Sequence, residues 1–245
     1  MAGHVKVMSE GIQELALFGF AHRQGVEDAV ATALEASVSA AHGAGRRARI
    51  ALSGGASPAP AYTKFASLTL DWSRVDIALV DDRWVDLDDA GSNEAMVIKA
   101  FEAAKGVTIF GMKTPHVTPF EGEATLEPIY AALRPFDVVV LGMGPDAHTA
   151  SWFPGSSQLM DCLDKNAAHT VIGVDASAAP VSGAYPLRMT MTLPAIKEAE
   201  QVILLLFGDD KKQVLTRALD TPAMNAPITA AIDACGERLV VFWAS

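Results

Sequence analysis

Short apolar runs recur along the chain and alternate with segments of helical periodicity. The runs cover residues 50–52, 75–80, 107–110, 138–141, 171–174, 202–207 and 239–243. Most of them are continuous rather than alternating, as expected of strands that are covered on both faces of a parallel sheet. Helical spacing lies between many of the runs, at 26–41, 94–104, 126–133 and 210–219. This alternation predicts an α/β fold with a mostly parallel sheet and flanking helices.

No internal repeat and no low-complexity linker divides the 245 residues. Because one α/β domain can reach roughly 250 residues, we expect a single domain over residues 1–245. Residues 111–122 are rich in Pro and Gly and are predicted to form a loop. Residues 154–186 are predicted to be irregular apart from one strand, and this segment is a candidate lid or insertion.

The formal net charge of −10 argues against sequence-independent nucleic-acid binding, which needs a basic face. An anionic ligand must therefore be held by local cations and backbone N–H groups. Cys162 and Cys235 form no CxxC motif and no disulfide framework, which favours a reducing compartment. Residues 1–10 lack the pattern of a secretory signal, and no apolar run approaches the ~20 residues that span a membrane. We expect a cytoplasmic protein that binds neither nucleic acid nor membrane.

Polar clusters follow several of the predicted strands, and ligands of open parallel sheets bind beyond the carboxyl ends of the strands. The first cluster, SGGASP at 53–58, contains Ser53, Gly54, Gly55 and Ser57. Glycines let the backbone approach a ligand, and Pro58 suits the first turn of a helix whose free N–H groups attract an anion. The GK[ST] ending of a Walker loop is absent. The alternative is an ordinary strand-to-helix turn.

The second cluster is DDRWV at 81–85. We predict a site role for Asp81 and Arg83, which stand at the end of the preceding strand. The acidic residues at 86–89 are expected to form a solvated loop. An EF-hand is excluded because Ala90 and Val97 occupy positions where calcium needs oxygen ligands.

The third cluster is GMGPDAHTASWFPG at 142–155. Its opening resembles the dinucleotide-binding fingerprint, but residues 153–155 would stop a helix within about two turns, so NAD binding is discounted. Asp146 and His148 are its titratable groups, and in a locally extended chain their side chains would point to one side. A histidine with a pKa near neutrality beside a carboxylate is a candidate general base. The alternative is a structural or solvated histidine.

Two cations occur later in the chain. Arg188 stands alone in an otherwise uncharged segment, and Lys211 follows the apolar run 202–207. Arginine binds phosphate oxygens in a planar fork, and lysine adds a point charge. Taken singly, Arg188 could equally be a surface charge, and a lysine in the position of Lys211 is more often a surface residue at a helix N-terminus.

Together these blocks resemble the 6-phosphogluconolactonase family. They occur in the order seen there: SGGASP, DDRWV followed by SN at 92–93, GMGPDAHTASWFPG, and RMTMTLPAI at 188–196. The resemblance implies a Rossmann-like fold that is shared with glucosamine-6-phosphate deaminases. It also implies hydrolysis of 6-phospho-D-glucono-1,5-lactone in the pentose phosphate pathway, with neither a metal nor an organic cofactor.

Mapped onto this chain, the resemblance gives each group a role. The 53–57 loop, Arg188 and Lys211 would hold the 6-phosphate. His148 would take a proton from the attacking water, and Asp146 would orient the imidazole.

Other roles stay open at the level of the sequence. The oxyanion could be stabilised by N–H groups around Gly144 or by Arg83. Asp81 would hold either a sugar hydroxyl or Arg83. The oligomeric state, monomer or homodimer, is also open.

Three positions depart from the family pattern. Ala147 replaces the usual Gly, which would cost roughly 1 kcal/mol if the position needs a positive φ. Asp86 replaces a frequent Pro, and Ala56 lacks a hydroxyl that many relatives carry there.

Two alternative functions remain. Glucosamine-6-phosphate deaminases place a carboxylate shortly after the histidine, but residues 149–155 contain no Asp or Glu. A sugar-phosphate sensor would keep the cavity without turnover, and such regulators usually carry a DNA-binding segment that this chain lacks.

Overall fold

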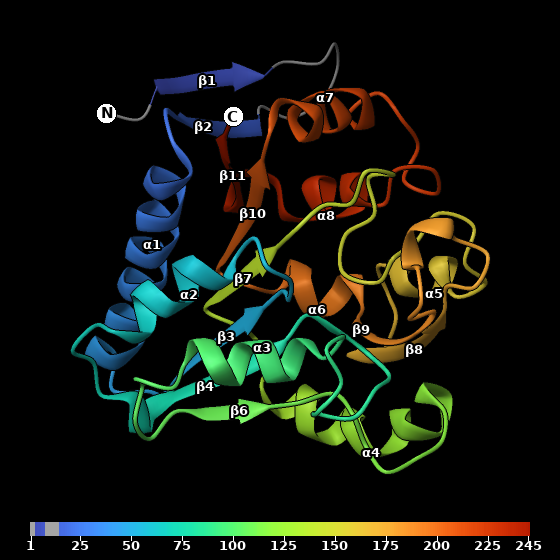
Figure 1. The fold of residues 1–245 in the computed structure, drawn as a ribbon, viewed down its shortest axis with the longest axis horizontal. Helices are drawn as coiled ribbons and strands as arrows, with labels where there is room; N and C mark the ends of the chain where they lie inside the picture. Colours follow the sequence, from blue (N-terminus) through green and yellow to red (C-terminus); the bar gives the residue numbers. More distant parts are fainter. Residues whose placement is uncertain (1–2, 8–14) are drawn as a thin grey trace.

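An eight-stranded sheet forms the centre of the computed structural model, which describes residues 3–7 and 15–245 (Figure 1). In spatial order its strands are β1 (Gly3–Val7), β2 (Leu15–Phe20), β11 (Leu239–Ala244), β10 (Gln201–Phe207), β7 (Val138–Leu141), β3 (Ala48–Leu52), β4 (Val75–Leu79) and β6 (Thr108–Phe110). The β1–β2 pair is antiparallel, whereas the pairs from β2 to β6 are parallel. The prediction of a mostly parallel α/β sheet is confirmed.

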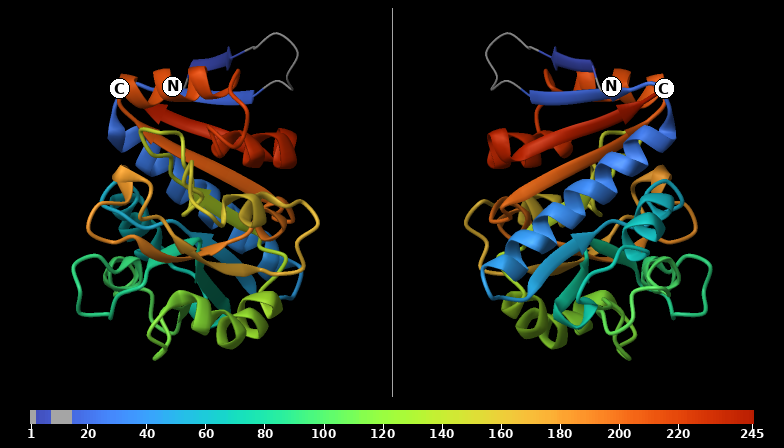
Figure 2. Two further views of the ribbon diagram at one scale, coloured as in Figure 1. Left: turned by 90° about the vertical axis from the view of Figure 1, so that its right-hand side faces the viewer. Right: turned by 90° about the vertical axis from the view of Figure 1, so that its left-hand side faces the viewer.

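Helices cover both faces of this sheet (Figure 2). The helices α1 (Arg23–Gly43), α2 (Ala59–Ala66) and α3 (Asn93–Ala100) pack beside one another along one face. The opposite face carries α6 (Leu193–Lys197), α8 (Ile228–Cys235) and a second, smaller sheet. The helix α7 (Asp209–Ala218) follows β10, and α4 (Pro119–Ala132) packs against the smaller sheet.

The smaller sheet is antiparallel and corrects one sequence expectation. It contains β5 (Asp81–Arg83), β9 (Leu187–Met191) and β8 (Val171–Asp175), in that spatial order. The apolar run 171–174 therefore belongs to an antiparallel strand outside the parallel sheet. Its continuous apolar character fits β8 because that strand packs against α4.

Two segments contain more helix than the sequence predicts. The expected loop 111–122 ends early, because α4 begins at Pro119 behind a capping box formed by Thr118 and Glu121. Within the segment 154–186, a short helix α5 (Leu159–Leu163) precedes β8. The hairpin of β1 and β2 was also not predicted. No secretory signal was expected in residues 1–10. Of these, residues 1–2 and 8–10 lie outside the described residues.

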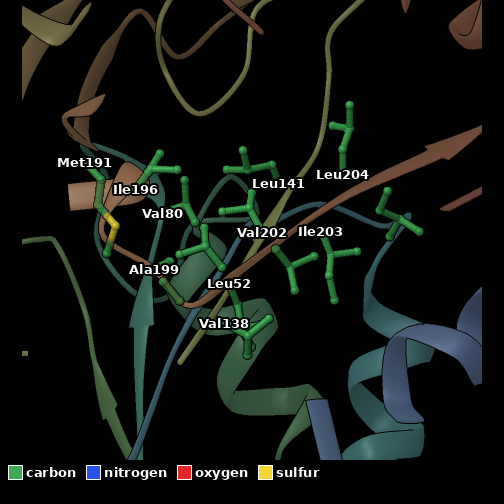
Figure 3. Close-up of a cluster of buried hydrophobic side chains, with 14 of the residues drawn as sticks. Leu52, Val80, Val138, Leu141, Met191, Ile196, Ala199, Val202, Ile203 and Leu204 are labelled. Atoms are coloured by element: carbon green, nitrogen blue, oxygen red, sulfur yellow. The ribbon is translucent and has the colours of Figure 1, made fainter. Parts of the chain in front are cut away.

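A layer of aliphatic side chains fixes the central strands (Figure 3). Every residue of β7 is fully buried, and so are Leu52 of β3 and Val202 of β10. Burying such a side chain contributes about 1.5–3 kcal/mol, so the carboxyl ends of these strands form a rigid base for the loops that follow them. Cys162 and Cys235 are also buried and are not bonded to each other.

Among the residues described, no helix combines the length and the apolar character that crossing a bilayer requires.

Candidate active site

A cavity of about 370 Å³ lies at the carboxyl ends of β3, β4, β7 and β10. This volume falls within the roughly 300–1,000 Å³ of small-molecule sites, at the sheet edge where open α/β folds bind ligands. The predicted site residues that line it are Ser53, Gly54, Gly55, Ser57, Asp81, Arg83, Gly144, His148, Arg188 and Lys211. Asp146 does not line the cavity but contacts His148.

The loop between β3 and α2 forms one wall and presents backbone donors. The N–H of Ser53 donates to Val140 O over 3.0 Å, and the Tyr62 hydroxyl donates to Ser53 O over 3.0 Å, which anchors the start of the loop. Gly55 adopts a φ of +98°, which glycine tolerates best. Within the described part of the chain, the N–H groups of residues 54–57 donate no hydrogen bond. Free N–H groups before a helix favour an anion.

Two arginines face each other across the small sheet. The register of β5 and β9 pairs Arg83 directly with Arg188, so both side chains lie on one face. Like charges in this position are destabilising unless an opposite charge compensates them. Burial lowers the pKa of Arg188; the nearby Asp81 opposes this shift and Arg83 adds to it. The pair therefore favours an anionic ligand.

Backbone carbonyls fix the orientation of both guanidinium groups. Arg188 donates from Nε to Tyr185 O over 2.5 Å and from Nη2 to Ser182 O over 3.2 Å. Arg83 donates from Nη1 to Gly91 O over 2.6 Å. The Nε of Arg83 is buried and has no partner among the described residues. Arg188 is only 6% exposed, which excludes the surface-charge alternative.

Asp81 has partners other than those expected. Its Oδ2 accepts a hydrogen bond from Ser151 Oγ over 2.6 Å and lies 3.9 Å from Nη1 of Arg188. Among the described residues, no hydrogen bond or ion pair joins it to Arg83. The expected alternative in which Asp81 holds Arg83 is therefore wrong, because the carboxylate turns toward β9 and the 142–155 loop.

Asp146 and His148 form a hydrogen-bonded pair beside the cavity. His148 Nδ1 lies 2.5 Å from Asp146 Oδ1. Burial raises the pKa of Asp146, but the hydrogen bond and charge of His148 outweigh it, and the net shift is downward. Asp146 therefore remains a carboxylate that orients the imidazole, and Nε2 is left as the ring nitrogen available for a proton.

The backbone around this pair is a turn and not the extended segment that the sequence suggested. Ala147 has a φ of +62°, and its N–H donates to Gly144 O over 3.2 Å. The N–H of Gly144 donates back to His148 O over 2.8 Å. This amide is therefore not free to bind an oxyanion, which removes one of the N–H groups that were candidates around Gly144.

The positive φ of Ala147 gives a stability prediction. Ala147→Gly is expected to raise the free energy of unfolding by about 1 kcal/mol, because glycine adopts this backbone conformation without a Cβ clash. Urea denaturation measures the change. Ala36→Gly, at an exposed position inside α1, is the matched control and is expected to lower stability by about 1 kcal/mol. A loss of stability at both positions would contradict strain at Ala147.

Lys211 lies in the first turn of α7 and reaches the loop after β7. Its Nζ donates to Met143 O over 2.7 Å. Burial lowers the pKa of Lys211, and the nearby Asp146 opposes that shift. The side chain is thus directed into the site and is not an ordinary surface lysine.

Asn93 and Phe153 are among the other residues that line the cavity, and neither was singled out from the sequence. Asn93 is 4% exposed, and its Nδ2 donates to Asp81 O over 2.9 Å. A Cβ on Gly54 would lie 1.9 Å from the Asn93 side chain, so only glycine fits there. Phe153 packs 4.4 Å from the His148 ring and 5.4 Å from the Arg188 guanidinium. The SN pair at 92–93 and the FPG triplet at 153–155 are the parts of the motifs that could have indicated these two residues.

Asp82, behind the cavity, ties β5 to α3. Its carboxylate accepts the N–H groups of Asn93 over 2.7 Å and Glu94 over 3.0 Å. Burial raises the pKa of Asp82 to about 6, although these hydrogen bonds oppose the shift. The contact fixes Asn93 at the first position of its helix.

The acidic loop at 86–89 is only partly solvated. Asp86 and Asp88 are exposed as expected. Asp89 is half-buried, and its Oδ1 accepts hydrogen bonds from Gly91 N over 2.7 Å and from the Tyr185 hydroxyl over 2.9 Å. The described residues contain no cluster of His, Cys, Asp or Glu suited to a metal ion.

Comparison with known proteins identifies the family. The model described as "Glucosamine-6-phosphate isomerases/6-phosphogluconolactonase" matches residues 21–241. The 6-phosphogluconolactonase of Xylella fastidiosa is 39% identical, over 80% of this chain and 82% of its own length. That of Caulobacter vibrioides is 34% identical, over 93% of this chain and 97% of its own.

Solved structures agree with the sequence relatives. A 6-phosphogluconolactonase from Shewanella baltica superposes with a TM-score of 0.86 and 31% identity, covering 96% of this chain and 99% of that one. A monomeric glucosamine-6-phosphate deaminase, at 16% identity and a TM-score of 0.75, shares the fold. The chain therefore belongs to the glucosamine-6-phosphate isomerase/6-phosphogluconolactonase family.

Proposed function

We propose that this chain hydrolyses 6-phospho-D-glucono-1,5-lactone to 6-phosphogluconate in the oxidative pentose phosphate pathway. One observation carries the proposal: the imidazole of His148, held by Asp146, lines the same cavity as a paired-arginine anion site. A lactone carbonyl is already activated, so a positioned base and charge stabilisation suffice for its hydrolysis.

In the proposed mechanism, His148 acts through Nε2. It takes a proton from water as the water oxygen bonds to C1, and the carbonyl oxygen becomes an oxyanion. Collapse of this intermediate breaks the bond between C1 and the ring oxygen, and the imidazolium returns its proton to that oxygen. The Asp146 carboxylate stabilises the imidazolium between these two steps.

The oxyanion donor is proposed to be Arg83. The N–H of Gly144 itself is already bonded to His148 O, whereas the Arg83 guanidinium lines the cavity beside His148 and carries a full charge. A positive charge held at the cavity wall would stabilise the negative charge that develops on the carbonyl oxygen.

The 6-phosphate is proposed to bind to the free N–H groups of residues 54–57, to Arg188 and to Lys211. The loop supplies directional donors, and Arg188 supplies a charge whose orientation two carbonyls fix. Asp81 is proposed to hold a sugar hydroxyl, since it lines the cavity and keeps its contact with Ser151.

Replacement of Arg188 tests the phosphate assignment. Arg188→Ala is expected to raise KM for the phosphorylated lactone roughly 10- to 30-fold, from the loss of about 1.5–2 kcal/mol in charge-assisted hydrogen bonding. The KM for unphosphorylated gluconolactone should change little. Arg217→Ala, an exposed arginine in α7, is the control. Equal losses on both substrates would refute the assignment.

A lactonase assay tests the function itself. Freshly prepared 6-phosphogluconolactone is followed by proton release, with the spontaneous hydrolysis rate subtracted. A deaminase would instead release ammonia from glucosamine 6-phosphate. A sensor would bind 6-phosphogluconate without accelerating loss of the lactone.

We further propose that the protein works without a cofactor as one catalytic domain in the cytoplasm, as a monomer or homodimer. The residues proposed to bind the substrate and to transfer protons all belong to this chain. Light scattering during size-exclusion chromatography measures the oligomeric state.

A further inference from the structure

Tyr185 connects the two arginines of the cavity, and neither the motifs nor the proposed mechanism uses it. It lies just before β9, in the segment that follows the short 3₁₀ helix Pro180–Ser182. Its backbone oxygen accepts the Arg188 Nε hydrogen bond, and its ring lies 5.9 Å from the Arg83 guanidinium. One residue thus contacts both cations.

The hydroxyl of Tyr185 closes a ring of contacts around Arg83. It donates to Asp89 Oδ1 over 2.9 Å, and the same oxygen accepts the Gly91 N–H over 2.7 Å. The carbonyl of Gly91 in turn accepts the Arg83 Nη1 hydrogen bond over 2.6 Å. The hydrogen bond between Tyr185 and Asp89 therefore joins the segment before β9 to the loop after β5. This junction lies next to Gly91, whose carbonyl orients Arg83.

The contact between Tyr185 and Gly91 is tight. A Cβ on Gly91 would lie 2.6 Å from Tyr185 Cζ, so only glycine lets the ring lie against the backbone at this point. Asp89 raises the pKa of Tyr185, which keeps the hydroxyl protonated as the donor in this hydrogen bond. With Gly91 held between Asp89 and the ring, its carbonyl has one fixed direction.

We propose that Tyr185, acting through Asp89 and Gly91, is a positioning residue that aims the Arg83 guanidinium at the lactone carbonyl. The inference rests on the proposed role of Arg83 as oxyanion donor. Catalysis gains when a donor is held in place before charge develops, because no reorganisation is needed at the moment of reaction. The Tyr185 hydrogen bond supplies this rigidity without touching the substrate.

Removal of the hydroxyl is the test. Tyr185→Phe is expected to lower kcat roughly 3- to 10-fold, the effect of one neutral hydrogen bond, on both phosphorylated and unphosphorylated gluconolactone. KM should stay within about twofold, since the proposed phosphate ligands are unchanged. Asp89→Ala should match this loss, whereas Asp89→Asn, which keeps an oxygen acceptor, should retain more of kcat. Asp88→Ala, an exposed neighbour in the same loop, is the control.

A double-mutant cycle separates positioning from a general structural effect. In an Arg83→Ala background, Tyr185→Phe should lower kcat no further, because the residue acts through Arg83. Additive losses, or an unchanged kcat in Tyr185→Phe alone, would overturn the inference. If Arg83→Ala itself leaves kcat unchanged, the oxyanion assignment fails and this inference fails with it. If Arg83→Ala lowers kcat and Tyr185→Phe does not, only the positioning role is lost.

Discussion

Replacement of His148 by alanine is expected to lower kcat on 6-phosphogluconolactone by roughly 10²–10⁴. The imidazole is the proposed base for water and the proposed acid for the ring oxygen, so both proton transfers lose their partner. Binding of 6-phosphogluconate should remain largely intact, because the proposed phosphate ligands lie on other segments. Initial rates corrected for spontaneous hydrolysis give kcat, and calorimetry gives product affinity.

A second histidine serves as the control for this experiment. His22→Ala removes an exposed imidazole that precedes α1 and makes no side-chain capping bond there. It should leave kcat within about twofold of the wild type, since it does not line the cavity. Full activity in His148→Ala would remove the residue from its proposed role. A parallel loss of product binding would mean that the cavity, and not only the base, was damaged.

The parallel sheet was predictable because burial on both faces leaves a strong signal in the sequence. Six of the seven apolar runs became strands of that sheet. The run at 171–174 carries the same signal, yet it became β8 of the small antiparallel sheet. Continuous apolar character reports that a strand is covered; it does not report which strand lies beside it.

The arginine pair was not predictable from local sequence. β5 (DDR) contains no apolar residue that would mark it as a strand, and the alternating apolar and polar residues of β9 (LRMTM) do not indicate which strand it pairs with. Arg83 and Arg188 pair across a long separation in the chain, and neither segment indicates its partner. Tertiary structure alone brings the two charges to one face.

The 142–155 loop, which carries His148, was only partly predictable. The sequence placed Asp146 and His148 side by side, and the structure joins them at 2.5 Å. The expected extended backbone was wrong, because Ala147 takes a left-handed conformation and the chain turns back on Gly144. Spacing of two residues is compatible with both geometries, and only the turn removes the Gly144 amide from the oxyanion candidates.

The same turn leaves no room for a side chain on Gly144. A Cβ there would lie 2.1 Å from both Nδ1 and Cε1 of His148 and 2.7 Å from Asp146 Oδ1. Its φ is not among the positive values, so the penalty for a side chain is steric and falls on the imidazole. The imidazole must move to admit even a methyl group.

Gly144→Ala is therefore expected to lower kcat by about 10² or more, since a misplacement near 1 Å costs a catalytic group roughly that factor. KM should change less, because the proposed phosphate ligands are untouched. Gly142→Ala, two residues earlier, is the matched control: its Cβ would meet nothing within 4 Å, and most of kcat should survive. Equal activity in the two variants would show that the enzyme does not depend on where the His148 ring sits. A selective loss in Gly144→Ala would tie catalysis to the position of that imidazole without altering a single titratable group.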